Sequence, residues 1–139
     1  MLTPKTIEDI KALIAQGAEE NLNLDYKGAA ALGTSDGIKK EIAKDVSAMA
    51  NSDGGIIIYG VKESDEEGKK HLPEKVDPVN RIEFTKERLE QIIQSNIHPK
   101  IESLKIHPIS LDNPEHVIYV VEITQSMTCH QTKYKRGAF

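Results

Sequence analysis

The stretch Asn51-Ser-Asp-Gly-Gly-Ile-Ile-Ile-Tyr-Gly-Val61 joins a dense turn signal to a continuous apolar run. The asparagine and the paired glycines are typical of a tight turn that ends the preceding element. The run from Ile56 to Val61 shows no polar alternation, and such runs are typical of strands that are buried on both faces. The sequence therefore predicts that 56–61 is the central strand of a sheet.

Helical and extended segments surround this strand along the chain. Before it, Ile38, Ile42 and Val46 recur at helical spacing behind a serine that can cap a helix. After it, 84–97 has the same periodicity. The remaining elements are expected as a helix over 6–16 and strands over 22–27, 101–109, 116–123 and 134–136. This alternation predicts an α/β fold, a single domain with a mixed β-sheet flanked by helices.

Length and composition indicate one cytoplasmic domain. The 139 residues suffice for a hydrophobic core, and the net charge of −4 argues against a protein that coats nucleic acid through bulk positive charge. The single cysteine, Cys129, fits a reducing compartment, and no apolar run is long enough for a membrane span. The chain stops soon after Arg136, an abrupt end that is compatible with a fragment of a longer protein.

Acidic side chains accompany two of the predicted strands. Asp25 and Lys27 share the polar face of the strand over 22–27, because side chains alternate along a strand. Glu63 lies just past the buried strand, where α/β sheets place ligands when their strands are parallel. Converging carboxylates suit Mg²⁺ or Mn²⁺, and a nearby lysine can neutralise a phosphate. If these groups converge, the chain can cut a phosphodiester bond.

A third acid is ambiguous on the sequence alone. Glu20 lies five positions before Asp25, whereas strict alternation puts Glu19 on the face of Asp25. Glu20 can join the site only if the chain bends near Asn21. The residue pattern leaves both glutamates open.

Several motifs together resemble the Schlafen AlbA-like domain. They are the acidic strand that ends in Tyr26-Lys27, the Ala-x-Ala-Asn-x-x-Gly-Gly turn at 48–55, the Tyr-Gly-Val strand at 59–61 and the closing Tyr-x-Arg-Gly at 134–137. The resemblance covers most of the chain, from Ala18 to Gly137. It implies an α/β fold with a mixed sheet and nucleic-acid binding. For Schlafen nucleases it further implies metal-dependent cleavage of structured RNA such as tRNA.

The resemblance also implies which residues carry the chemistry. The family's three catalytic acids fall on Glu20, Asp25 and Glu63, which would bind Mg²⁺ or Mn²⁺, and a family lysine falls on Lys27. This chain has Asp25 where the family usually has glutamate, and Glu63 where it usually has aspartate. Both exchanges keep a carboxylate and change its reach by one methylene.

Two basic groups could dock nucleic acid despite the negative net charge. We favour Lys133, Lys135 and Arg136 together with Lys27, because the C-terminal group includes the closing motif of the family and arginine binds phosphate through two parallel hydrogen bonds. The second group comprises Lys40 and Lys44, four positions apart on one helical face, with a further lysine beside them. The expected partner is RNA, with DNA as the alternative and no membrane. The sequence leaves open whether the chain forms a homodimer.

Two functions therefore remain from different classes. One is a metal-dependent endoribonuclease, and the other is a non-catalytic DNA- or RNA-binding regulatory module. The three acids favour the nuclease, because a pure binder gains nothing from carboxylates that repel phosphate. An ATPase-like domain is disfavoured because GxxxxGK[ST] is absent. The stretch 64–78 is interpreted as an exposed loop, with Lys69-Lys70-His71 as solvated residues.

Overall fold

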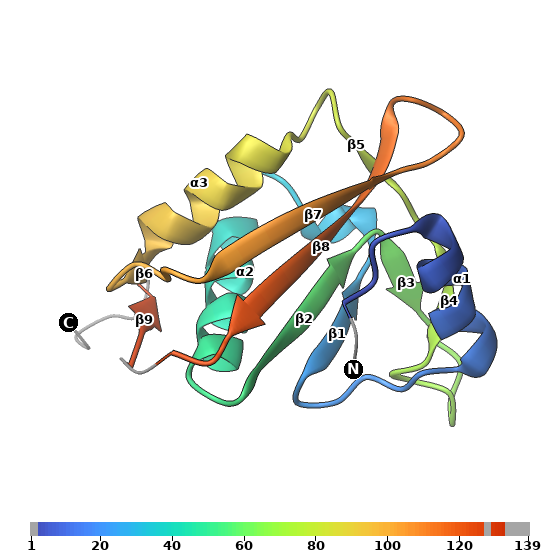
Figure 1. The fold of residues 1–139 in the computed structure, drawn as a ribbon, viewed down its shortest axis with the longest axis horizontal. Helices are drawn as coiled ribbons and strands as arrows, with labels where there is room; N and C mark the ends of the chain where they lie inside the picture. The colour runs from blue at the N-terminus through green and yellow to red at the C-terminus, as the bar shows by residue number, and fades with distance from the viewer. Residues whose placement is uncertain (1–2, 127–128, 133–139) are drawn as a thin grey trace.

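The computed structural model describes residues 3–126 and 129–132, and its core is a mixed five-stranded sheet (Figure 1). Strands β1 (Leu24–Lys27) and β2 (Gly54–Tyr59) run parallel to each other. The long strand β8 (His116–Thr124) is antiparallel to β2 and pairs also with β7 (Leu104–Ser110) and β5 (Val79–Asn80). Because β2 has a partner on each side, the prediction of a buried central strand is confirmed.

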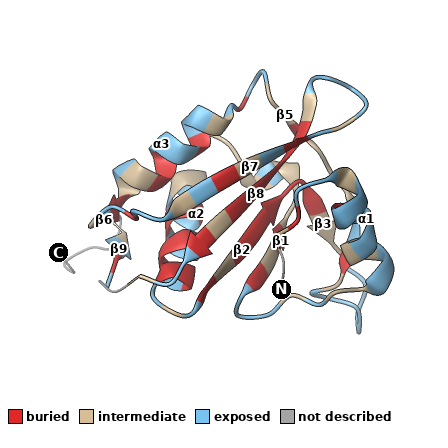
Figure 2. Ribbon diagram, in the orientation of Figure 1, coloured by how far each residue is buried: buried red, intermediate tan, exposed pale blue. Residues whose placement is uncertain are grey.

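Helices cover both faces of this sheet. Helices α2 (Asp36–Ala50) and α3 (Lys86–Asn96) pack on one face, and α1 (Ile7–Gln16) packs on the other. Each begins at a hydroxyl cap, Thr6, Ser35 or Thr85, whose side chain accepts a backbone N–H of the first turn. The burial pattern in Figure 2 follows this layering, with the buried residues concentrated in the central strands and on the inner sides of the helices.

The strand β1 presents different side chains to the two layers. Leu24 and Tyr26 are buried in the core on the α1 side. Asp25 and Lys27 therefore point to the α2 side, where their strand neighbours Ile57 and Tyr59 also lie. Asp25 and Lys27 thus share one face of β1, as the sequence predicted, and this face lies beside helix α2.

The second half of the predicted central strand departs from expectation. Gly60, with φ of 124°, ends β2, and the chain continues as β3 (Val61–Glu63) in a separate two-stranded sheet. Its partner is β4 (Pro73–Val76), so the interpretation of 64–78 as one exposed loop was wrong. The polar residues of β4 lie on a small solvent-facing hairpin, and such a hairpin needs no alternating apolar pattern.

Short elements complete the chain. A 3₁₀ turn, η1 (Ala29–Ala31), follows β1, and β6 (Ile97–His98) pairs with β9 (Gln131–Thr132). The strand expected at 134–136 lies outside the described residues. None of the helices in the described part of the chain combines the length and the hydropathy of a membrane-spanning segment.

Candidate metal and nucleic-acid site

The ambiguity between Glu19 and Glu20 is resolved by a tight turn. Asn21 and Leu24 exchange two backbone hydrogen bonds of 2.9 and 3.2 Å, which reverses the chain just before β1. Glu19 is exposed, whereas Glu20 is partly buried beside β1 and its side-chain oxygen Oε2 is fully covered. The bend that the five-residue spacing requires is therefore present, and Glu20 is the acid that joins the site.

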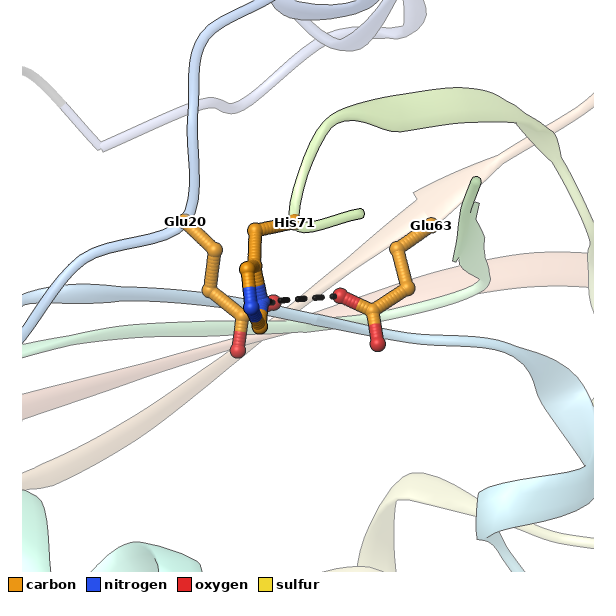
Figure 3. Close-up of side chains that lie close together, drawn as sticks. All are labelled: Glu20, Glu63 and His71. Carbon is orange, nitrogen blue, oxygen red and sulfur yellow. Dashed lines mark ion pairs between the residues drawn. The ribbon is translucent and has the colours of Figure 1, made fainter. Parts of the chain in front are cut away.

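Glu20, Glu63 and His71 form the tightest group of potential ligands. One side-chain ligand atom of each lies within 4.8 Å of those of the other two. The His71 Nδ1 is 3.5 Å from Glu20 Oε2 and 3.8 Å from Glu63 Oε2, and Figure 3 shows its ring between the two glutamates. The backbone N–H of Glu20 donates to the carbonyl of His71 over 2.8 Å. The turn before β1 and the β3–β4 hairpin are thus joined at this point.

Asp25 connects this group to helix α2. Its carboxylate Oδ2 is 3.6 Å from Lys27 Nζ, which is also 3.6 Å from Asp45 Oδ2. Burial disfavours the charged ammonium, but the carboxylates of Asp25 and Asp45 outweigh this and raise the pKa of Lys27. Lys27 therefore stays charged, and it lies between Asp25 of the sheet and Asp45 of α2.

Burial and the nearby acids change the ionisation of Glu20. Burial raises the pKa of Glu20 from an ordinary 4.5 to about 9, and the neighbouring carboxyls of Glu63 and Asp25 add to the effect. Asp25 therefore lies within the same carboxyl cluster as Glu20 and Glu63. The structure brings the three sequence-predicted acids together.

The donor set fits a divalent cation. Glu20 Oε2, Asp25 Oδ1 and Glu63 Oε2 are covered from solvent and have no hydrogen-bond partner among the described residues. Buried carboxylate oxygens normally have partners, so these three oxygens are free to act as ligands to a cation. Oxygen ligands suit Mg²⁺ and Mn²⁺, and the His71 imidazole adds a nitrogen that transition metals accept.

The other predicted binding residues fall into two groups. Lys40 and Lys44 are exposed on α2. Lys133, Lys135 and Arg136 lie outside the described residues, so their place relative to the acids stays a prediction.

His71 and Asp45 are the site residues that sequence reasoning missed. His71 was interpreted as a solvated loop residue, because its approach to Glu63 depends on the pairing of β3 with β4. Asp45 lies on the inner side of α2 among apolar residues, and its contact with Lys27 depends on how α2 packs on the sheet. A lone acid within an apolar helical stripe was the only available signal for Asp45.

Comparison with known proteins gives one family and a shared fold. The model of the family described as "Schlafen, AlbA_2" matches residues 20–139. No curated protein matches the chain.

Two solved structures are similar to this chain. The N-terminal domain of a RecG-related protein from Nitrosomonas europaea is 16% identical, with a TM-score of 0.64 over 88% of this chain and 78% of that one. The DIP2311 protein from Corynebacterium diphtheriae is 14% identical, with a TM-score of 0.52 over 91% of this chain and 23% of that one. At these identities the likeness shows the fold alone.

Proposed function

The chain belongs to the Schlafen AlbA_2 family, whose membership points to nucleic-acid binding, and from this premise we propose that it is a metal-dependent endoribonuclease. Its substrate would be a structured RNA such as tRNA. One observation carries the proposal. The carboxylates of Glu20, Asp25 and Glu63 come from separate segments and lie together. One oxygen of each is buried and lacks a hydrogen-bond partner among the described residues.

The charge balance of the cluster supports a cation. The site holds four acids, Glu20, Asp25, Glu63 and Asp45, and one lysine, Lys27, which pairs with Asp25 and Asp45, so the site is acidic when its carboxyls are ionised. An RNA phosphate would be repelled from such a surface. Glu20, Asp25 and Glu63 would hold Mg²⁺ or Mn²⁺, with His71 within reach of two of them. When bound, the ion would supply a water of lowered pKa and stabilise charge on the phosphate.

Lys27 would supply the permanent positive charge beside the phosphate. Its ammonium is partly buried and held between two carboxylates, which fixes its position and keeps it protonated. An ammonium held in a partly desolvated site stabilises developing negative charge more than a mobile surface lysine does. Asp45 would act as a positioning residue, because it holds Lys27 from the helix side.

Cleavage assays test the proposal directly. Purified protein should cut tRNA in Mn²⁺ or Mg²⁺ and should be inactive in EDTA. Asp25→Asn and Glu63→Gln should each abolish cleavage while RNA binding stays equal or becomes tighter, because each removes a metal ligand and also a negative charge. Glu19→Gln is the matched control, since Glu19 is exposed and outside the cluster, and it should keep full activity. Equal turnover in the wild type and the Asp25 and Glu63 variants would overturn the proposal.

A non-catalytic nucleic-acid-binding module is the second candidate. Lys40 and Lys44 are exposed on one side of α2, and neither forms an ion pair with a described residue. These free charges could contact phosphates without a metal. Metal-independent RNA or DNA binding, with no cleavage under any of the conditions above, would favour this candidate.

A further inference from the structure

A hollow lies beside the acidic cluster, where the ends of β1 and β2 meet helix α2. Its volume is about 420 Å³, within the range of roughly 300–1,000 Å³ that is usual for small-molecule sites. Ile38 and Ile42 of α2 supply apolar lining. The polar lining comes from Lys27, Ser35, Glu41, Asp45 and Tyr59, so apolar walls and several polar groups face the same space.

Tyr59 is the residue that marks this hollow as a binding site. Its side chain is only 1% exposed, yet its hydroxyl has no hydrogen-bond partner among the described residues. The buried tyrosines elsewhere are satisfied, since the Tyr26 hydroxyl donates to the Ala18 carbonyl and that of Tyr119 donates to the Phe84 carbonyl. A buried hydroxyl that lines a hollow without a partner is destabilising, so the arrangement points to a polar ligand atom at this place.

The polar groups around Tyr59 define a pattern of donors and acceptors. Lys27 and Tyr59 are paired across β1 and β2, so both side chains leave the sheet toward α2 at the same level. Asp45 faces them from α2, with its carboxylate 3.6 Å from the Lys27 ammonium. The hollow therefore offers a carboxylate acceptor and an ammonium donor side by side, and the Tyr59 hydroxyl can serve as either.

The hollow and the acidic cluster are neighbours. Asp45 also lines a smaller hollow of about 240 Å³ whose other walls include Glu20 and Asp25. Lys27 contacts both Asp25 and Asp45, and so forms part of the boundary between the two spaces. A nucleotide whose phosphate lies at the acids could place its base in the larger hollow.

We propose that this hollow binds a guanine base. Guanine carries two neighbouring donors, N1–H and the 2-amino group, which match the carboxylate of Asp45, and its O6 accepts from the Lys27 ammonium and from the unpartnered Tyr59 hydroxyl. Adenine, cytosine and uracil lack the paired donors, so each leaves part of the pattern unmatched. Unstacked bases of single-stranded loops are the usual targets of sequence-specific RNA recognition. As a determinant of the cleavage position, the guanine site rests on the proposed nuclease function.

Nucleoside binding in EDTA tests the site without metal or cleavage. Titration of the protein with guanosine, adenosine, cytidine and uridine, followed by NMR chemical shifts, should give the tightest binding for guanosine. Inosine, which lacks the 2-amino group, should bind about two- to tenfold more weakly, as expected for one lost hydrogen bond. Equal affinity for all four nucleosides, or no guanosine binding, would overturn the proposal.

Two tyrosine variants separate binding from folding. Tyr59→Phe removes a hydroxyl that has no partner among the described residues, so the fold should be unharmed while guanosine binding weakens about two- to tenfold. Tyr119→Phe is the matched control, because its buried hydroxyl bonds to Phe84 outside the hollow, and guanosine binding should not change. Unchanged guanosine affinity in Tyr59→Phe would contradict the proposal.

The two proposals fail in different ways. Loss of guanine preference in EDTA, with Mn²⁺-dependent cleavage retained, would reject only the base site. Guanine-selective binding that depends on Tyr59, in a protein that never cleaves RNA, would reject only the nuclease.

Discussion

Burial, more than the neighbouring negative charges, changes the ionisation of Glu20. Its carboxyl is partly buried and lies against those of Glu63 and Asp25. With its pKa raised to about 9, the metal-free protein holds a proton on this residue near neutral pH. Binding of a divalent cation would therefore release that proton, which couples metal affinity to pH.

Stability should fall with rising pH in the absence of metal. The folded chain keeps the Glu20 proton up to a pH of about 9, whereas the unfolded chain releases it near 4.5. Between these values unfolding releases a proton, so this contribution is complete below about 4.5 and is lost as the pH approaches 9. In EDTA, the thermal midpoint of the wild type should decline across this window more than that of Glu20→Gln. Parallel pH profiles for the two proteins would contradict the expectation.

His71 should tune which metal the site prefers. Its side chain is 62% exposed, and its backbone has a φ of 75°, which is uncommon for a residue other than glycine. Since imidazole nitrogen favours later transition metals over Mg²⁺, His71→Ala should weaken Co²⁺ binding by about tenfold or more and Mg²⁺ binding less. Calorimetric titration with each ion measures the difference. His116→Ala, outside the cluster, should leave both affinities unchanged, and a uniform loss for both ions in His71→Ala would contradict the selective role.

At the residue scale, sequence reasoning works where local geometry decides. Alternation along one strand correctly placed Asp25 and Lys27 on one face. It could not choose between Glu19 and Glu20, because the choice depends on a turn whose hydrogen bonds are made by Asn21 and Leu24. Tyr59 was assigned only to the buried strand, and nothing in its neighbours reveals that its hydroxyl lacks a partner.

At the scale of elements, the contact between β1 and β2 holds the site together. Gly55 has a φ of 151°, and a Cβ built there would lie 2.4 Å from the Asn23 carbonyl oxygen. The Asn23 side-chain amide donates to the Gly54 carbonyl over 2.7 Å, and the Ile56 N–H donates to the Asn23 carbonyl over 2.9 Å. The glycine pair therefore lets the start of β1, and with it Asp25, approach β2 closely.

A side chain at Gly55 should damage both the fold and the site. Gly55→Ala should lower the free energy of unfolding by more than about 1 kcal/mol. Backbone strain alone costs about 1–3 kcal/mol, and the clash with Asn23 adds to it. Urea denaturation measures this, and metal titration should show weaker binding as β1 shifts. Gly37→Ala is the control, since apart from its chain neighbours and its own helix backbone no atom lies within 4 Å of its Cβ position, and stability should change by less than about 1 kcal/mol. Equal stabilities of the two variants would contradict the role of the glycine contact.

The β3–β4 hairpin could not be predicted from the hydrophobic pattern of the sequence. The apolar run from Ile56 to Val61 indicates one strand, but Gly60 divides it between two sheets. A Cβ on Gly60 would lie 2.9 Å from the Ile118 side chain, a tertiary contact that no local pattern contains. Because this division carries Glu63 into the hairpin, the last acid reaches the site by a route that the sequence did not predict.

At the scale of the whole molecule, the layered α/β architecture was predictable from alternating periodicities. The surface that docks RNA was less predictable. The net charge is negative although the proposed partner is a polyanion, so overall charge does not indicate where RNA binds. Productive docking must therefore bring RNA to the acids by way of a local basic surface. The sequence offers the α2 lysines and the C-terminal cluster as candidates.

The C-terminal cluster should contribute more to RNA affinity than the helix lysines. Combined Lys133→Ala, Lys135→Ala and Arg136→Ala should weaken RNA binding and make the slope of log affinity against log salt shallower, because fewer counterions are released. The comparison is the triple variant Lys39→Ala, Lys40→Ala and Lys44→Ala, measured on the same RNA across a salt series. If only the helix variant loses affinity, RNA docks on α2 instead.

The crowding of carboxylates also bears on how such a domain evolves. Acids that repel one another destabilise the free protein, so under the proposed nuclease function they would be kept only by selection for cleavage. In a lineage released from that selection, replacement of Glu20 or Asp25 by a neutral residue would relieve repulsion, and drift would fix it readily. Descendants that only bind nucleic acid are therefore expected to lose these acids first and to keep the glycine turn and the buried strand.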